Sequence, residues 1–313
     1  IHNVVLQAGY SAKKIAEIDL IVSEMTSNLA KYAIGGEILF GTFTSNIEYV
    51  EIICIDEGPG ITDLSRMMND GISTTSTLGH GLGSISRLSD VFDIYSLKNW
   101  GTIVLSRVYK NTAPSKGKKA VPGIHPLVIS KPGEKVSGDG TYYEFTPEHV
   151  KILVADGLGH GIEANKAVNA AVAAFRGSKS NDPVETIRFI HNEIRRTRGI
   201  VGTVLFHNIK AKTWKSVGIG NISLKLTNHV TAKNLMSYNG IIGHNIPTTM
   251  KVQEFTNSDF NHLILCSDGI KSRWEISNFP GISKHDLSLQ AAVVYKDFGR
   301  KTDDMSVVFI KSI

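Results

Sequence analysis

Twice in this chain of 313 residues, an apolar run ends in an aspartate that is followed at once by glycine-rich backbone. The first case is EIICIDEGPG, which contains Asp56, and the second is VKILVADGLGHG, which contains Asp156. Each run predicts a strand that delivers an acidic side chain to a turn at the end of a sheet. Because the chain is also too long for a comfortable single core, we predict two domains, each with one such strand.

The boundary between the two halves is predicted in the polar, basic segment KNTAPSKGKK, which contains both Pro and Gly. We expect a first domain over residues 1–110, a linker over residues 111–120 and a second domain over residues 121–313. The first half holds 8 Lys/Arg and 12 Asp/Glu, a net charge of −4. Because the whole chain has a net charge of +5, the second half has a net charge of +9. A basic second half suits an acidic or phosphorylated protein partner, although an ordinary solvated surface explains it equally well.

Composition and patterning exclude several classes of protein. Hydrophobic residues make up 42% and charged residues 20%, which is typical of a globular chain. The longest apolar runs are well short of the roughly 20 residues needed to cross a bilayer, and there is no signal-peptide pattern, so we expect no membrane association. Cys54 and Cys266 lie in separate apolar runs, which predicts buried thiols and a cytoplasmic location. No basic helix interleaved with aromatics is present, so we expect no nucleic-acid partner.

Periodicity predicts different elements in the two halves. In the first half, apolar residues at helical spacing indicate a helix over residues 12–33, with Ser11 as its cap. Strands are expected over residues 37–44, 49–56, 91–97 and 102–109, with a second helix after the glycine-rich loop Gly71–Gly83. In the second half strands predominate, and helices are expected over residues 164–176, 184–197 and 286–295.

The first half contains the groups that a nucleotide site needs. Glu24 and Asn28 are four residues apart and share one helix face. An amide oxygen completes the coordination of a magnesium ion that mostly holds water and phosphate oxygens, and a buried carboxylate such as Asp56 accepts a hydrogen bond from the amine of a base. Glycines before a helix let backbone N–H groups meet phosphates. Each signal alone is weak, and the order of the three predicts an ATP site.

These motifs, SEMTSNLAKYA, IDEGPGITDLSRMMNDGISTTSTLGHGLGSISRLSDVF and WGTIVL, resemble the GHKL ATPase superfamily, and within it the anti-sigma-factor serine kinases. The resemblance implies an α/β sandwich, with Mg²⁺ and ATP bound, that phosphorylates serine or threonine on a small STAS-domain regulator. The implied roles are Glu24 as general base, Asn28 as magnesium ligand, Asp56 as adenine contact, Gly58 and Gly60 with Thr102 in the base pocket, and Gly79, His80, Gly81, Leu82 and Gly83 as the lid over the phosphates.

The second half carries four aspartates at turn positions beside apolar strands, namely Asp139, Asp156, Asp268 and Asp303. Strand ends in a sandwich can converge on one edge, and converging carboxylates repel unless a cation neutralises them. Oxygen-only ligands favour Mg²⁺ or Mn²⁺, and two such ions about 3.5–4 Å apart activate a water for attack on a phosphoester. Asp-Gly is a common turn dipeptide, which explains any one of these aspartates alone. Four of them at strand ends favour a metal site.

The surrounding motifs SGDGTYYEF, VKILVADGLGHGIEAN, GIVGTVLF, GIGN, LILCSDGI and RKTDDMSVVFI resemble the metal-dependent protein phosphatase (PPM) family, in its sporulation-protein-E-like branch. The resemblance implies a β-sandwich flanked by helices and hydrolysis of phosphoserine or phosphothreonine. The implied ligands of two Mn²⁺ or Mg²⁺ are Asp156 as bridge, Gly157 through its carbonyl, Asp268 and Asp303 at one ion, and Asp139 at the other, with Asp304 a weaker candidate.

The second half also departs from the phosphatase pattern. Leu158 occupies the position where eukaryotic relatives have a histidine, and His160 lies two residues further on, so no general acid is assigned from the sequence. No arginine is matched to a phosphate clamp. His191, on a predicted helix, is expected to be a surface or core residue rather than a ligand.

Together these observations predict an α+β protein that joins a GHKL-type α/β sandwich to a PPM-type β-sandwich. We expect a bifunctional regulator in a bacterial partner-switching pathway, with a STAS-domain phosphoprotein as substrate, a sigma factor or signalling complex as a further partner, and a homodimer suggested by related kinases. One alternative is that the ATP-binding half only binds or gates, and that the phosphatase alone is active. Another is a scaffold without catalysis.

Overall fold

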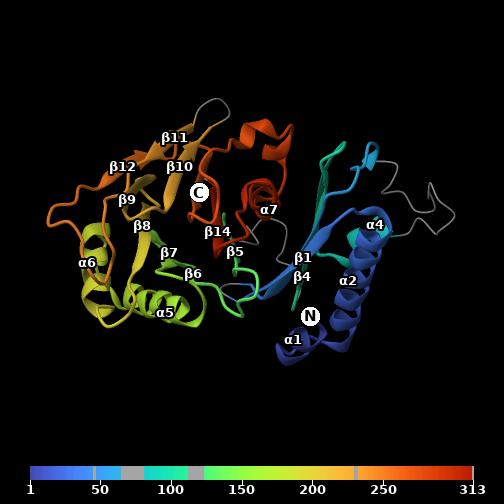
Figure 1. Cartoon of the computed structure of the whole chain (residues 1–313), viewed down its shortest axis with the longest axis horizontal. Coiled ribbons are helices and arrows are strands. Elements are labelled where there is room, and N and C mark those ends of the chain that lie inside the picture. Colours follow the sequence, from blue (N-terminus) through green and yellow to red (C-terminus); the bar gives the residue numbers. More distant parts are fainter. Residues whose placement is uncertain (45–46, 65–80, 112–122, 229–231, 312–313) are drawn as a thin grey trace. The chain divides into compact units, whose positions relative to one another are not determined.

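The computed structural model describes residues 1–44, 47–64, 81–111, 123–228 and 232–311 (Figure 1). The chain forms two compact units. Unit 1 consists of Ile1–Pro122 together with Phe279–Val293, and unit 2 consists of Gly123–Asn278 together with Val294–Ile313.

Unit 1 is built on a four-stranded antiparallel sheet in the order β1-β2-β4-β3. Its strands are β1 (Gly36–Phe43), β2 (Tyr49–Asp56), β3 (Val91–Leu97) and β4 (Gly101–Tyr109). Within the described residues, the helices that accompany the sheet are α1 (His2–Gln7), α2 (Ala12–Tyr32) and α4 (Gly81–Leu88). The long helix α2 begins at Ser11, whose side chain accepts a hydrogen bond from the Lys14 N–H at 3.3 Å, as predicted.

The helices cover one face of this sheet, and alternation along β2 and β4 explains how. Val50, Ile52 and Cys54 of β2 share a core with Ile18 and Ile21 of α2. Side chains on a strand alternate between faces, so the residues between these three point to the opposite face. The helical spacing of the apolar residues in α2 therefore docks the helix that carries Glu24 and Asn28 onto the strand that carries Asp56.

The other face of the unit 1 sheet carries a buried charge network. Arg107 of β4 is 2% exposed and donates to Glu51 of β2. Its guanidinium also donates to both carboxylate oxygens of Asp286, at 2.8 and 2.5 Å, and to the Ser288 hydroxyl at 2.8 Å. His285 meets Asp93 of β3 at 2.9 Å. Segment Phe279–Val293 is thereby held within unit 1.

Unit 2 contains two five-stranded sheets, in the orders β11-β10-β13-β14-β5 and β12-β9-β8-β7-β6. The first sheet consists of β5 (Ile124–Ile129), β10 (Ser223–Thr227), β11 (Ala232–Leu235), β13 (His262–Cys266) and β14 (Met305–Lys311). The second consists of β6 (Asp139–Phe145), β7 (His149–Gly157), β8 (Ile200–Asn208), β9 (Thr213–Ile219) and β12 (Gln253–Thr256). The pairings within both sheets are antiparallel.

Strand β7 is the centre of this unit because both of its faces are buried. Ile152 and Val154 lie in a core shared with strands of both sheets, including Leu224 and Val308. The residues between them, Leu153 and Ala155, belong to a second core with the helices. The two sheets therefore form a sandwich, and the helices cover the outer face of the sheet that contains β7.

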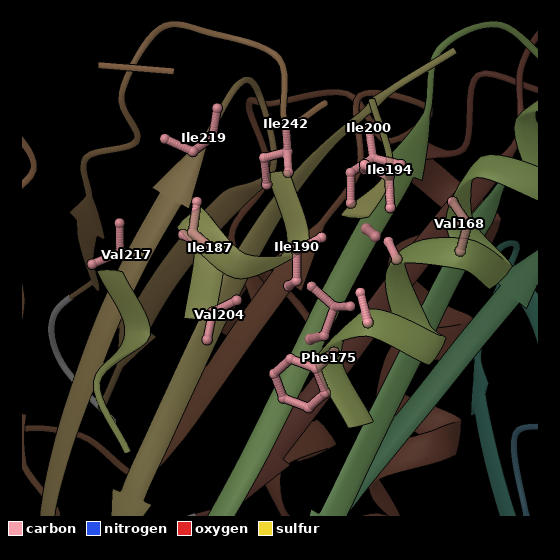
Figure 2. Packing of buried hydrophobic residues seen from close by; sticks show 14 of the residues in the cluster. Val168, Phe175, Ile187, Ile190, Ile194, Ile200, Val204, Val217, Ile219 and Ile242 are labelled. Carbon is pink, nitrogen blue, oxygen red and sulfur yellow. The ribbon is translucent and has the colours of Figure 1, made fainter. Parts of the chain in front are cut away.

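The covering helices are α5 (Gly161–Gly177) and α6 (Pro183–Glu193), which lie along the sheet of β6–β9 in Figure 1. Figure 2 shows Ile187 and Ile190 of α6 and Phe175 of α5 around Val204, with Val168 of α5 further along the same core. Asp182 caps α6 by accepting from the Val184 N–H at 2.8 Å, as its position before Pro183 predicts. The remaining elements are α7 (Leu287–Phe298) and two 3-10 turns, Ile276–Asn278 and Ile282–Lys284.

The predicted α+β class is confirmed, and among the described elements α1, β11, β12 and the two 3-10 turns were not predicted. Helix α1 is too short for a periodicity signal, and β11 and β12 have four residues each, with little apolar alternation. Both cysteines are buried as predicted, and burial raises the pKa of each thiol to about 12. Across the described residues, no helix is long and apolar enough to cross a membrane.

Candidate nucleotide and metal sites

In unit 1, the structure brings Glu24 and Asn28 to the start of helix α4. A Cβ placed on Gly81, the first residue of α4, would lie 3.2 Å from Oε2 of Glu24 and 3.4 Å from the amide of Asn28. A side chain at this position would make tight contacts and would require Glu24 to shift by a few tenths of an ångström. The acid, the amide and the N-terminal end of a helix therefore meet in one place, as the order of the sequence motifs predicted.

Asp56 ends β2 and ties together the two loops that flank it. Its Oδ1 accepts from the Gly58 N–H at 2.7 Å and from the Thr102 N–H at 3.1 Å. Across the described residues, its Oδ2 makes no hydrogen bond, so one carboxylate oxygen remains for the amine of a base. The Asp56–Thr102 link explains why these two residues, distant in sequence, belong to one pocket.

Close backbone approach explains the glycines around Asp56. Gly60 has φ +75°, and a Cβ there would lie 2.0 Å from the Leu97 carbonyl oxygen. Ser96, which the sequence did not single out, joins this turn to β4. Its hydroxyl accepts from the Ile61 N–H at 2.7 Å, donates to the Gly101 carbonyl at 3.0 Å and meets the Thr102 hydroxyl at 2.9 Å.

The predicted phosphate lid lies only partly within the described residues. Gly79 and His80 lie outside them, as does most of the glycine-rich loop. Gly81 and Gly83 stand in the first turn of α4, with Gly83 buried, and the side chain of Leu82 packs against the core of unit 1. In this lid, Leu82 therefore has only its backbone to offer a phosphate.

In unit 2, strand register brings two of the four predicted metal ligands together. Asp139, the first residue of β6, pairs directly with Asp156 near the end of β7. Burial raises the pKa of Asp139 to about 7, and the carboxylates of Asp304 and Asp268 add to the rise. Burial and the charge of Asp139 raise the pKa of Asp156 to about 9. The charges of Asp268 and Asp303 contribute to that second rise, so all four predicted carboxylates act on one electrostatic site.

Asp139 has the surroundings of a side chain that lacks its partner. Both of its carboxylate oxygens are buried, and within the described part of the chain neither has a hydrogen-bond partner. The hydroxyls of Ser267 and Ser306 are near enough to lower its pKa in part. The Ser267 hydroxyl instead accepts from the Ser306 N–H at 3.0 Å. A buried carboxylate without donors is costly, and a cation is the partner that removes the cost.

Asp304 differs from Asp139 because backbone amides occupy its oxygens. Its Oδ1 accepts from the Lys131 N–H at 2.8 Å and its Oδ2 from the Gly138 N–H at 2.9 Å. Its own N–H donates to Oδ1 of Asp303 at 2.9 Å. Asp304 therefore fixes the residue before Asp139 and the turn that carries Asp303, a role that the sequence did not reveal.

Helix α5 closes the floor of the carboxylate site. A Cβ on Gly157 would lie 2.5 Å from the Ala164 carbonyl oxygen, and the Gly157 N–H donates to the Gly138 carbonyl at 2.9 Å. Asp268 is exposed at the rim, where its Oδ2 accepts from Asn221 Nδ2 at 2.8 Å.

The donor set fits a hard divalent cation, since the converging groups are carboxylates with two orphaned oxygens among them. In the described ranges, no three Asp, Glu, His or Cys side chains already form a closed metal-binding set. The four carboxylates therefore influence one another electrostatically, but among the described residues no three of them are grouped closely enough to form a metal-ligand set.

Comparison with known proteins identifies unit 1. Residues 1–107 match the family of histidine kinase-like ATPase domains. The serine/threonine-protein kinase RsbT of Bacillus subtilis (strain 168) is 36% identical to this chain over 101 residues, which make up 32% of this chain and 76% of RsbT. The chain belongs to the histidine kinase-like ATPase family. The matched region contains Glu24, Asn28 and Asp56.

Two solved structures are similar in fold to this chain over 60% of its length. One is a chain from work on the bacterial stressosome, "a modular system that has been adapted to control secondary messenger signaling", with a TM-score of 0.54, 22% identity and 98% of that chain covered. The other is RsbX in complex with magnesium, with a TM-score of 0.52, 19% identity and 94% of that chain covered. The matched share exceeds residues 1–122, so the similarity includes unit 2. At this identity it shows the fold, and the predicted joining of two folds is confirmed.

His160 was noted in the sequence without an assigned role, and its pairing with Glu134 was not predicted. His160, which precedes α5, meets Oε1 of Glu134 through its Nδ1 at 2.6 Å. Leu158, at the position where a histidine was sought, instead donates its N–H to the Gly199 carbonyl at 3.2 Å. The acidic partner lies 26 residues earlier in the sequence, so spacing alone did not indicate the pair.

Proposed function

We propose that this chain sets the phosphorylation state of a STAS-domain regulator. Its first unit transfers phosphate from ATP to a serine or threonine, and its second unit removes phosphate with two Mn²⁺ or Mg²⁺. The observation that carries the proposal is the pairing of Asp139 with Asp156 across β6 and β7, with Asp268 and Asp303 near enough to add to the rise in the Asp156 pKa, in a chain whose other unit belongs to an ATPase family.

For the kinase unit, we assign the general base to Glu24 and a magnesium contact to Asn28. Phosphoryl transfer requires positioning and charge neutralisation more than covalent chemistry. A base and a metal-binding amide that share one helix face, both next to Gly81, would lie beside the terminal phosphate of ATP. Asp56 has one free oxygen for the exocyclic amine of adenine, with Gly58, Gly60 and Thr102 around it. The lid is assigned to Gly79–Gly83.

For the phosphatase unit, we assign the metal ligands to the carboxylates of Asp139, Asp156, Asp268 and Asp303 and to the Gly157 carbonyl. Two divalent ions, when bound, supply charge and an activated water for attack on a phosphoester. The side chains around the site would then orient the phosphoester and donate or accept protons. Because the Glu134 carboxylate engages Nδ1 of His160, Nε2 remains available to hold a proton for the departing serine or threonine oxygen.

The substrate assignment is supported by the kind of proteins to which this chain is similar. RsbT is named a serine/threonine-protein kinase, and a stressosome chain shares the fold. A small phosphoprotein of STAS type satisfies both units, since one site adds and the other removes the same group. A sigma factor or signalling complex acting downstream, a homodimeric assembly and a cytoplasmic location complete the proposal.

The test uses the purified full chain with γ-labelled ATP, Mn²⁺ and a panel of STAS-domain proteins. We expect label to appear on serine or threonine of one partner and to be released from it after ATP is exhausted. If no partner is labelled or delabelled, the proposal fails. If a partner is bound only when ATP is present and is never labelled, the ATPase unit is a binding module and the kinase assignment is wrong.

A further inference from the structure

Arg198 has a rigid backbone and a free side chain, and it stands next to the carboxylate site. It lies in the turn before β8, between Thr197 and Gly199. Its carbonyl accepts from Nε2 of His244 at 2.8 Å, and the Gly199 N–H donates to the Thr197 hydroxyl at 3.1 Å. The turn is therefore fixed on both sides of Arg198.

The guanidinium group of Arg198 has no partner of its own. The side chain is exposed, and in the described part of the chain it makes no hydrogen bond and no ion pair. Its charge contributes to lowering the pKa of Glu163, but Lys166, which pairs with Glu163 at 2.7 Å, is the main cause. Lys166 therefore already neutralises Glu163. In the described part of the chain, the five N–H donors of the Arg198 guanidinium have no acceptor.

The position of this group relative to the carboxylates follows from two neighbouring contacts. Nη1 of Arg198 lies 3.0 Å from the site that a Cβ on Gly159 would occupy. Gly159 follows Asp156 by three residues, and its carbonyl oxygen lies 3.4 Å from the equivalent site on Gly138. Gly138 directly precedes Asp139. The guanidinium therefore lies against the loop that follows Asp156, and that loop in turn adjoins the residue before Asp139.

The charges around the site indicate which kind of ligand a guanidinium at this position would bind. The site supplies carboxylate oxygens, which bind cations and repel a phosphate ester. A dianionic phosphoryl group needs positive charge with defined hydrogen bonds, and the planar guanidinium fork provides two parallel donors to its oxygens.

We propose that Arg198 binds the phosphoryl oxygens of the phosphoserine or phosphothreonine substrate at the carboxylate site. This inference rests on the proposed phosphatase function and adds to it a substrate-binding residue that no sequence motif indicated. Arg196, which is exposed two residues away on the same turn, supplies a matched control of equal charge.

The first measurement is the binding of inorganic phosphate to the full chain with Mg²⁺, by titration calorimetry, which requires no turnover. We expect Arg198→Ala to raise the Kd for phosphate about 10- to 100-fold, since hydrogen bonds to charged groups contribute about 1.5–3 kcal/mol. Arg198→Lys should retain part of the affinity because it keeps the charge and loses the fork. Arg196→Ala should bind as the wild type does.

The second measurement is hydrolysis of a phosphoserine peptide with Mn²⁺. We expect Arg198→Ala to raise KM by a similar factor and to change kcat little, because the contact holds the phosphate before reaction as well as during it. Thermal unfolding of each variant checks that the exposed substitution leaves the fold intact.

The outcomes separate this inference from the proposed function. If phosphate affinity falls in Arg198→Ala while the wild type hydrolyses nothing, the phosphate contact is supported and the phosphatase function fails. If the wild type binds no phosphate, or if Arg198→Ala matches the wild type in both Kd and KM, the inference is overturned and the phosphatase function stands or falls on its own assay. If Arg196→Ala weakens binding as much, a diffuse positive field replaces the specific site and the inference is also overturned.

Discussion

Asp139 and Asp156 are direct cross-strand partners at the ends of β6 and β7, and the charge of Asp139 raises the pKa of Asp156. Two buried carboxylates side by side are stable only when one carries a proton or when both hold a cation. Burial raises the pKa of Asp139 to about 7 and that of Asp156 to about 9, so we expect protons to compensate these charges in the metal-free chain. A divalent cation replaces those protons.

Glu24→Gln separates transfer from binding in the ATPase unit. Because Glu24 is assigned as general base, the variant should lose phosphoryl transfer to the partner by about 10²–10⁴-fold while the Kd for ATP changes only a few-fold. Asn28→Ala should instead weaken the binding of magnesium-ATP. Partner labelling and ATP titration distinguish the two, and equal labelling by Glu24→Gln and the wild type would show that the base has been misassigned.

His160→Asn tests the proton donor of the phosphatase unit. A serine oxygen must gain a proton as it leaves, whereas nitrophenolate leaves readily without one. We therefore expect phosphoserine peptide hydrolysis to fall by roughly 10²-fold or more, with p-nitrophenyl phosphate hydrolysis affected far less. Glu134→Gln should reproduce a smaller part of the loss because it disturbs the 2.6 Å contact to Nδ1. Equal losses on both substrates would argue for a structural role.

Arg107→Ala should destabilise unit 1 by about 3–5 kcal/mol, because removing one member of a buried ion network leaves an uncompensated charge behind. Glu51 is 4% exposed and would be that charge. Lys13→Ala is the control, since Lys13 is 85% exposed and its pairing with Glu17 at 3.9 Å is weak. Urea unfolding monitored in both variants makes the comparison, and a change below 1 kcal/mol in Arg107→Ala would contradict the buried network.

His191 predicts a loss of stability in acid. Its Nδ1 accepts from the Gly243 N–H at 3.1 Å, which requires an unprotonated nitrogen. Burial lowers its pKa, with Arg195, His244 and Arg188 adding to the effect. The unfolded chain therefore binds a proton first, below about pH 6.5, and the free energy of unfolding falls as pH decreases through that region. His191→Asn keeps an acceptor without a titrating proton.

The measurement is urea unfolding at pH 7, 6 and 5 for the wild type and for His191→Asn. We expect the wild type to lose on the order of 1 kcal/mol more than the variant, which is the contribution of one hydrogen bond. Parallel curves for the two proteins would show that this histidine does not titrate on unfolding.

Local patterns were enough to predict most of this fold. The helical spacing of apolar residues in α2 predicts a helix with one buried face. The continuous apolar run of β2 predicts a strand that is buried on both faces. The aspartates at turns were recognisable because acid followed by glycine after an apolar run is a local signal. The strand pairing that sets Asp139 opposite Asp156 was not predicted, because the sequence indicated only that the ends of strands in a sandwich can converge on one edge.

What the sequence did not reveal depends on contacts between distant segments. Glu134 meets His160 across 26 residues, and Asp286 meets Arg107 across 179. Separations of this length follow neither helix nor strand periodicity. In the sequence, each of these residues looks like an ordinary charged surface residue. Arg198 was passed over for the same reason, since its place beside Gly159 arises from the pairing of β7 with β8.

The most direct test of the account counts the metal ions in the carboxylate site. Mn²⁺ titration calorimetry on the full chain without nucleotide should give two bound ions for the wild type, and Asp156→Asn should lose both because it removes the bridging ligand. In the presence of EDTA, the same variant should be at least as stable as the wild type, since it relieves the repulsion with Asp139. A wild type that binds no Mn²⁺, or an Asp156→Asn variant that binds two ions unchanged, would contradict the central claim.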